Sequence, residues 1–168
     1  GVTEISDSAF YRCSELAQIS LPTSLKSIGK NAFGYSGLKY INILEGVTSI
    51  GESAFYESEI YVIELPRTLN FIGDRAFISR NLKDVVYSGT EAEWGNISVD
   101  YSVNPYLKNA TKHYAVVASG KCGDSAYWYL DQNYVLTIAG SGCMYDYEPD
   151  NQPWLNLRDQ MKGVIVGG

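Results

Sequence analysis

An Ala-Phe pair recurs four times in the first half of the chain, and its spacing limits what the chain can fold into. The phenylalanines are Phe10, Phe33, Phe55 and Phe77, which follow one another at steps of 23, 22 and 22 residues. An isoleucine lies five residues before each of them, and a valine or leucine lies three residues before that isoleucine. A repeat of this length predicts a solenoid, in which each unit contacts only its neighbours.

After each phenylalanine comes a triplet of apolar residues, at steps of three and then two. The triplets are Leu16-Ile19-Leu21, Leu38-Ile41-Ile43, Ile60-Ile63-Leu65 and Leu82-Val85-Tyr87. The step of two is the period of a strand with one buried face. The polar residues before each Ala-Phe pair predict a tight turn that leads into a short helical turn, with the phenylalanine in the core. One such unit buries too little apolar surface to fold alone, because ordering its backbone costs more than its burial returns.

These units resemble the BspA-type leucine-rich repeats of bacterial surface proteins. The resemblance rests on segments such as Ser24-Leu25-Lys26-Ser27-Ile28-Gly29 and Asn31-Ala32-Phe33, and it covers residues 1 to about 89. It implies a right-handed solenoid with a parallel sheet on its concave side. It also implies a secreted or cell-surface bacterial protein with a role in adhesion or protein binding. The cysteine that commonly follows Ala-Phe in this family is present only at Cys13.

Three segments are expected along the chain. Residues 1–89 form four repeats, residues 90–117 a capping helix and strand, and residues 118–168 a small β domain. The helix is predicted by Thr90 and Glu93, which fit a capping box, and the strand by the run Ala110 to Val117. The expected fold class is therefore α/β and strand-rich, with a right-handed leucine-rich-repeat solenoid followed by a small antiparallel β domain.

The last segment carries the pattern of a β-hairpin. Trp128 and Leu130 alternate with polar or aromatic neighbours before the turn, and Leu136 and Ile138 do so after it, which predicts one shared apolar face. The later residues at positions 161, 164 and 166 repeat the three-then-two spacing of the triplets. We therefore expect the segment to end in the strand of a further repeat, and the chain to be a piece of a longer protein.

Composition excludes two classes of partner. The net charge is −6 and no basic run is present, which argues against binding to the phosphate backbone of a nucleic acid. The longest apolar stretch, from Tyr114 to Ala118, is far too short to cross a bilayer. We therefore expect no nucleic-acid partner and no membrane insertion of this chain.

Two groups of residues have side chains that could serve catalysis or metal binding. His113 and Cys122 could form a base and a nucleophile, but nine residues separate them and the histidine lies in a predicted strand. Asp146, Glu148 and Asp150 alternate as calcium ligands do, without the glycine and the bidentate glutamate of a known loop. A structural histidine and a solvated acidic loop are favoured, so we predict no catalytic residue, no metal and no cofactor.

The cysteines that flank the hairpin leave one question open. The predicted strand pairing places Cys122 and Cys143 on opposite faces, which argues against a disulfide between them. A bulge at Gly140 or Gly142 would shift this parity and allow the bond.

The candidate ligand-binding surface is the outward face of the stacked triplet strands. Its side chains differ from rung to rung, which suits a protein ligand better than a repetitive one. The candidate residues are Tyr40, Asn42, Tyr61, Glu64, Gln18 and Asp84. The predicted function is a non-enzymatic, extracellular or cell-surface module for protein binding or adhesion, whose partner is a protein or a ligand on a host or cell surface. The alternatives are a structural spacer, or carbohydrate binding through Tyr127, Tyr129 and Tyr134 of the β domain.

Overall fold

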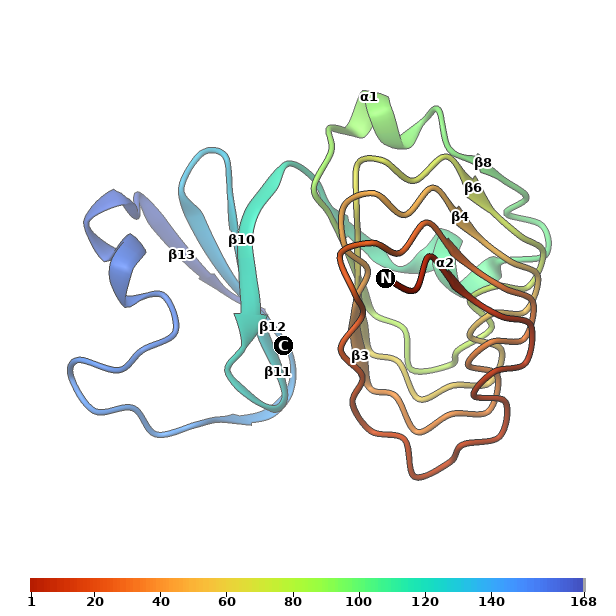
Figure 1. The fold of residues 1–168 in the computed structure, drawn as a ribbon. Coiled ribbons are helices and arrows are strands. Elements are labelled where there is room, and N and C mark those ends of the chain that lie inside the picture. The colour runs from red at the N-terminus through yellow and green to blue at the C-terminus, as the bar shows by residue number, and fades with distance from the viewer. Residues whose placement is uncertain (168) are drawn as a thin grey trace.

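A computed structural model describes residues 1–167, and its first two thirds form a stack of similar loops (Figure 1). One parallel ladder of two-residue strands, which we call the Ile ladder, runs in the order β1-β2-β4-β6-β8. Its strands are β1 (Glu4–Ile5), β2 (Ser27–Ile28), β4 (Ser49–Ile50), β6 (Phe71–Ile72) and β8 (Ser98–Val99). The sequence predicted the burial of these isoleucines but not that they form strands.

A second parallel sheet, which we call the triplet sheet, contains the predicted strands. It runs in the order β3-β5-β7-β9. Its strands are β3 (Tyr40–Asn42), β5 (Val62–Leu65), β7 (Asp84–Tyr87) and β9 (Thr111–His113). The predicted strands around Ile41, Ile63 and Val85 are confirmed, whereas the residues around Ile19 form no strand in the described chain. That rung lies at the open end of the stack and has a neighbour on one side only.

The segments that carry Ala-Phe are turns, and the predicted helical turn is wrong. Asn31 and Tyr35 have φ angles of 52° and 57°, in the left-handed region that no right-handed helix contains. Their backbone N–H groups donate sideways to the next repeat, from Asn31 to the Glu52 carbonyl at 2.9 Å and from Tyr35 to the Tyr56 carbonyl at 2.8 Å. These bonds between repeats alternate with turn bonds along the chain, such as that from the Gly34 N–H to the Asn31 carbonyl at 3.1 Å, so no continuous helix forms.

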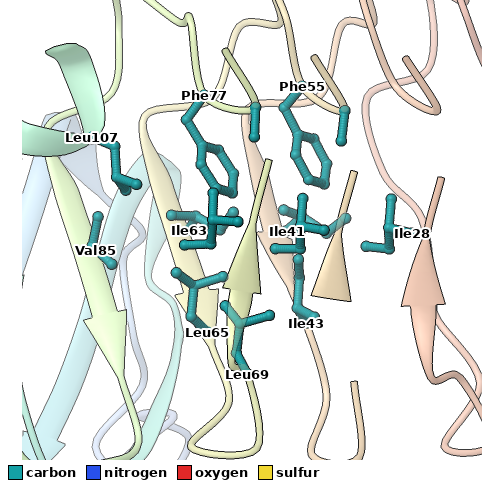
Figure 2. Packing of buried hydrophobic residues seen from close by; sticks show 14 of the residues in the cluster. Ile28, Ile41, Ile43, Phe55, Ile63, Leu65, Leu69, Phe77, Val85 and Leu107 are labelled. Carbon is teal, nitrogen blue, oxygen red and sulfur yellow. The ribbon is translucent and has the colours of Figure 1, made fainter. Parts of the chain in front are cut away.

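The phenylalanines form the stack that the spacing predicted, and Figure 2 shows two of its members, Phe55 and Phe77. Ring centroids of consecutive phenylalanines, from Phe10 through Phe33 and Phe55 to Phe77, lie 5.2, 5.3 and 5.3 Å apart. The last three rings are buried, and Phe10 at the open end is half-buried. The isoleucines and leucines of both ladders fill the space around this stack.

Residues 90–113 add one rung to each parallel sheet: β8 is the fifth strand of the Ile ladder and β9 the fourth strand of the triplet sheet. The helix predicted after Thr90 is present as α1 (Glu91–Trp94). Its capping box is complete, because the Thr90 hydroxyl accepts from the Glu93 backbone and the Glu93 carboxylate accepts from the Thr90 backbone. A second short helix, α2 (Pro105–Asn109), follows. Among the described residues, no helix is both long enough and apolar enough to cross a membrane.

The side chain of Asn104 closes the end of the stack. In the repeats, the backbone N–H of a core phenylalanine donates to the next repeat, as Phe55 does to the Ala76 carbonyl at 2.8 Å. Phe77 has no such neighbour, and its N–H donates instead to Asn104 Oδ1 at 3.3 Å. Asn104 Nδ2 donates in turn to the Gly73 carbonyl at 3.2 Å. The buried amide therefore takes the place of the backbone of a missing repeat.

The apolar cross-section behind that amide is covered by α2 and β9. Leu107 is fully buried and lies beside Val85 at the end of the core (Figure 2). Lys112 occupies the position in β9 that is in register with Val85. Its ammonium group donates to the carbonyls of Leu107, Lys108 and Ala110 at 2.6, 2.6 and 2.7 Å. These bonds satisfy the carbonyls that end α2.

Residues 116–166, which we call the β unit, form a separate four-stranded sheet. Its strands are β10 (Val116–Lys121), β11 (Gly123–Asp131), β12 (Val135–Met144) and β13 (Gly163–Val166). The hairpin register is as predicted, with Trp128 opposite Ile138 and Leu130 opposite Leu136. The sheet is mixed rather than purely antiparallel, because β13 runs parallel to β12. The apolar face of the hairpin is covered by Tyr147, Trp154 and the 3-10 helix η1 (Leu155–Gln160).

Candidate functional site

The outward side chains of the triplet sheet form two columns, fixed by the strand register. One column holds Tyr40, Val62, Asp84 and Thr111, and the other holds Asn42, Glu64, Val86 and His113. Four of the candidate residues stand in these columns: Tyr40 and Asp84 in the first, and Asn42 and Glu64 in the second. His113 was expected in a strand, but its place in the second column follows only from the pairing of β9 with β7.

The β unit covers most of this face (Figure 1). Tyr127, Tyr129 and Ala139 of its hairpin pack against Val62 and Val86, all of which are buried. The ring of Tyr127 also stacks on that of Tyr40, with centroids 4.8 Å apart. Strand alternation places Tyr127, Tyr129 and Ala139 on the hairpin face opposite to the one that holds Trp128. The centre of the contact with the solenoid is therefore apolar.

Glu64 is the first of two polar contacts that fix the β unit on the triplet sheet. Its carboxylate accepts hydrogen bonds from the Tyr40 hydroxyl and, at 2.8 Å, from the Ser119 hydroxyl of β10. Burial raises the pKa of Glu64, and these two hydrogen bonds oppose the shift without cancelling it. Burial also raises the pKa of Tyr40, and the nearby Glu64 carboxylate adds to that shift.

His113 makes the second polar contact. Its Nε2 lies 2.7 Å from Asp84 Oδ1 and 2.7 Å from the hydroxyl of Tyr129. The rings of His113 and Tyr129 are also in contact, with centroids 4.2 Å apart. Burial raises the pKa of Tyr129, and the nearby Asp84 carboxylate adds to the shift. The single histidine therefore joins the solenoid to the β unit.

The six predicted site residues have different environments in the structure. Glu64 and Asp84 are only 8% and 9% exposed, because the β unit lies over them. Tyr40 and Tyr61 are half-buried at the same junction. Gln18 and Asn42 are exposed. Glu64 is thus on the outward face of the sheet but buried, and nothing in the repeat pattern shows that a later domain folds back onto the sheet.

The structure also places the residues of the other chemical alternatives. Tyr127 and Tyr129 pack on the solenoid, so they form no open sugar-stacking platform, and Tyr134 lies on the other face with Trp128. Cys122 is buried in that second cluster, away from His113 on the triplet sheet. The three cysteines are free throughout residues 1–167. In the same part of the chain, no three acidic, histidine or cysteine side chains gather as metal ligands would.

A cleft of about 810 Å³ opens at one side of the junction, and we call it the junction cleft. The solenoid contributes Tyr61, Arg80, Lys83, Tyr106 and His113 to its walls, among others, and the β unit contributes Tyr129, Thr137 and Ser141. A smaller groove of about 220 Å³ is lined by Asn42, Glu64 and residues 116–119. Neither was predicted, because both exist only where the two units meet.

A row of aromatic rings, partly exposed to solvent, lies on the turns, and we call it the aromatic strip. It consists of Tyr11, Arg12, Tyr35 and Tyr56. The ring centroids of Tyr11 and Tyr35 are 5.7 Å apart, and those of Tyr35 and Tyr56 are 5.6 Å apart. The Arg12 guanidinium lies 5.4 Å from the Tyr11 centroid and 5.8 Å from that of Tyr35. Tyr11 and Tyr35 remain 39% and 41% exposed.

The strip has a local signal in the sequence. A tyrosine follows the core phenylalanine by one or two positions in three successive repeats. Gly34 makes room for the first ring, because a Cβ atom at that position would lie 3.1 Å from the ring of Tyr11. The sequence therefore contains a signal for the strip, although the predicted binding surface was the outward face of the triplet strands.

The family comparison agrees with the repeat architecture. The sequence model of the BspA type leucine rich repeat region matches residues 1–104, with 6 copies, and so extends beyond the four repeats predicted to residue 89. Among solved structures, the chain is similar to a leucine-rich repeat protein from Bacteroides ovatus, with 30% sequence identity and a TM-score of 0.47. That similarity covers 51% of this chain and 23% of the other, and no curated protein matches the chain. Because the family match spans more than half of its residues, the chain belongs to the BspA-type leucine-rich repeat family.

Proposed function

We propose that this chain is a non-enzymatic binding module of a secreted or cell-surface bacterial protein, and that it attaches to a protein partner through the aromatic strip. The family supports a repeat-based interaction module in general. The observation that carries the proposal is the partly exposed row of Tyr11, Arg12, Tyr35 and Tyr56, which, within residues 1–167, is not part of the apolar cluster between the triplet sheet and the β unit.

The chemistry of the strip suits a protein contact. Tyrosine and arginine are the residues most often found at interface hot spots, because they bury a large area and also form hydrogen bonds. The rings are held by one another and by Arg12, so little side-chain entropy remains to be lost on binding. Gln18 and Asn42, the exposed members of the predicted sheet site, are proposed as a second contact on the rim of the triplet sheet.

An adhesion assay tests the proposal. Fluorescent beads coated with the purified chain are washed over epithelial-cell monolayers, bacterial lawns and immobilised extracellular-matrix proteins, and the retained beads are counted. The double variant Tyr11→Ser/Tyr35→Ser should lose most of the retention seen with the wild type. Phe71→Ser is the matched control, because Phe71 is an aromatic residue with 45% exposure outside the strip. Equal retention of the double variant and the wild type would refute the role of the strip.

A structural spacer is the second candidate, and one observation favours it. The β unit is fixed on the triplet sheet by apolar packing and by the contacts of Glu64 and His113, so the two units form a stiff pair. If no surface in the panel retains the wild-type beads, the spacer becomes the better explanation.

A further inference from the structure

We propose that the junction cleft binds an acidic saccharide. The site is distinct from the aromatic strip, so either proposal can fail without the other. The cleft volume of about 810 Å³ lies in the range of small-molecule sites and is too confined for a folded protein surface. It also has walls from both units, which means that the ligand would be recognised only when the β unit is docked.

Charge is distributed unevenly around this cleft. The chain as a whole carries a net charge of −6, yet the cleft holds the cations Arg80 and Lys83. Both side chains are exposed, and within residues 1–167 neither forms an ion pair. The carboxylate that also lines the cleft, that of Asp84, is already in contact with His113. An arginine and a lysine that are free to bind favour a ligand with a carboxylate or sulfate group.

The end of α2 does not oppose an anion in this position. Residues Asn109 and Ala110, at the carboxyl end of the helix, line the cleft, and exposed helix-end carbonyls would repel negative charge. The ammonium group of Lys112 donates to three of these carbonyls. The negative ends of these three carbonyl groups are therefore neutralised by the Lys112 ammonium group.

The remaining lining is polar and neutral, with aromatic faces. Hydroxyl or amide groups are supplied by Asn109, Thr137 and Ser141, and half-buried rings by Tyr61 and Tyr106. Hydroxyls and amides both donate and accept, which matches the hydroxyl groups of a sugar, while a tyrosine ring offers an apolar face with a polar edge. A peptide that adds as a strand to a sheet edge would instead need pockets for its alternate side chains. An acidic saccharide uses both the cations and the neutral groups.

The proposal is tested by titration of the whole chain with trigalacturonate, with maltotriose as the neutral probe and tetraglutamate as the acidic peptide. Calorimetry gives the affinity. The NMR signal of the imidazole reports the location, because His113 is the only histidine and lines the cleft. We expect trigalacturonate to bind and to shift the His113 signal. Added salt should weaken this binding. Maltotriose and tetraglutamate should bind at least about tenfold more weakly, a difference of about 1.4 kcal/mol.

Two variants connect the binding to the cleft. The double variant Arg80→Gln/Lys83→Gln should lower the affinity for trigalacturonate by at least about tenfold, because it removes both free cations of the cleft. Lys39→Gln is the matched control, because Lys39 holds the same place before β3 that Lys83 holds before β7 but does not line the cleft. All three substituted residues are exposed, so thermal unfolding should be unchanged. The proposal is overturned if trigalacturonate fails to bind, if tetraglutamate binds as tightly, if the His113 signal does not move, or if Lys39→Gln has the same effect as the double variant.

Discussion

Replacement of Phe55 by alanine should be among the most damaging single changes in the chain. Phe55 is fully buried and is stacked between Phe33 and Phe77, with ring centroids 5.3 Å away on each side. Burial of such a side chain contributes about 2–3 kcal/mol. Each of its two aromatic contacts contributes roughly 0.5–1.5 kcal/mol more. Because the neighbouring repeats cannot collapse into the cavity, we expect a loss of about 4 kcal/mol, within the usual range for a buried Phe.

Phe10→Ala is the matched comparison for that change. Phe10 occupies the same position in the first repeat, but it is half-buried and stacks on one ring only. Its removal should therefore cost no more than about half as much as the removal of Phe55. The two variants thus separate the effect of an interior rung from that of the open end.

Guanidinium denaturation, followed by circular dichroism and by tyrosine fluorescence, measures both free energies of unfolding. Two probes are needed because a repeat stack can unfold in parts, and their agreement shows that one transition is measured. A Phe55→Ala midpoint close to that of the wild type, or an equal cost for Phe10→Ala, would show that the stacked rings are not the core of the solenoid.

Two further predictions concern the end cap and the junction. Asn104→Ala should lower the stability by about 2–3 kcal/mol in the same denaturation assay, because it leaves the N–H of Phe77 without its acceptor, whereas the exposed Asn109→Ala should have little effect. Burial raises the pKa of Glu64, so the folded chain holds that proton more tightly than the unfolded chain, and stability should fall as pH rises from the ordinary Glu pKa through the raised value. Glu64→Gln should remove this part of the pH dependence and leave the chain at least as stable at pH 7. A variant whose stability changes with pH as steeply as that of the wild type would contradict this explanation.

The parts of the fold that could be predicted are those with local, repeated signals. The spacing of Phe33 from Phe55 and Phe77 fixed the stack, and the alternation around Trp128 fixed the hairpin register. The helical turn at Ala-Phe was predicted wrongly. Its residue types suit a helix, but alternate N–H groups of each turn donate to the neighbouring repeat, and single residues such as Asn31 take left-handed angles.

The sequence by itself determined the family, the inward residues and the two-faced hairpin, because periodicity and alternation are properties of neighbouring residues. Only the tertiary structure decided which surface remains free. The Ser119 hydroxyl reaches Glu64 across 55 residues of sequence, and Asn104 meets Gly73 across 31. Contacts at such separations leave no periodic pattern, since they depend on how two finished units fit together. That fit covers the triplet sheet, creates the junction cleft and leaves the aromatic strip exposed to solvent.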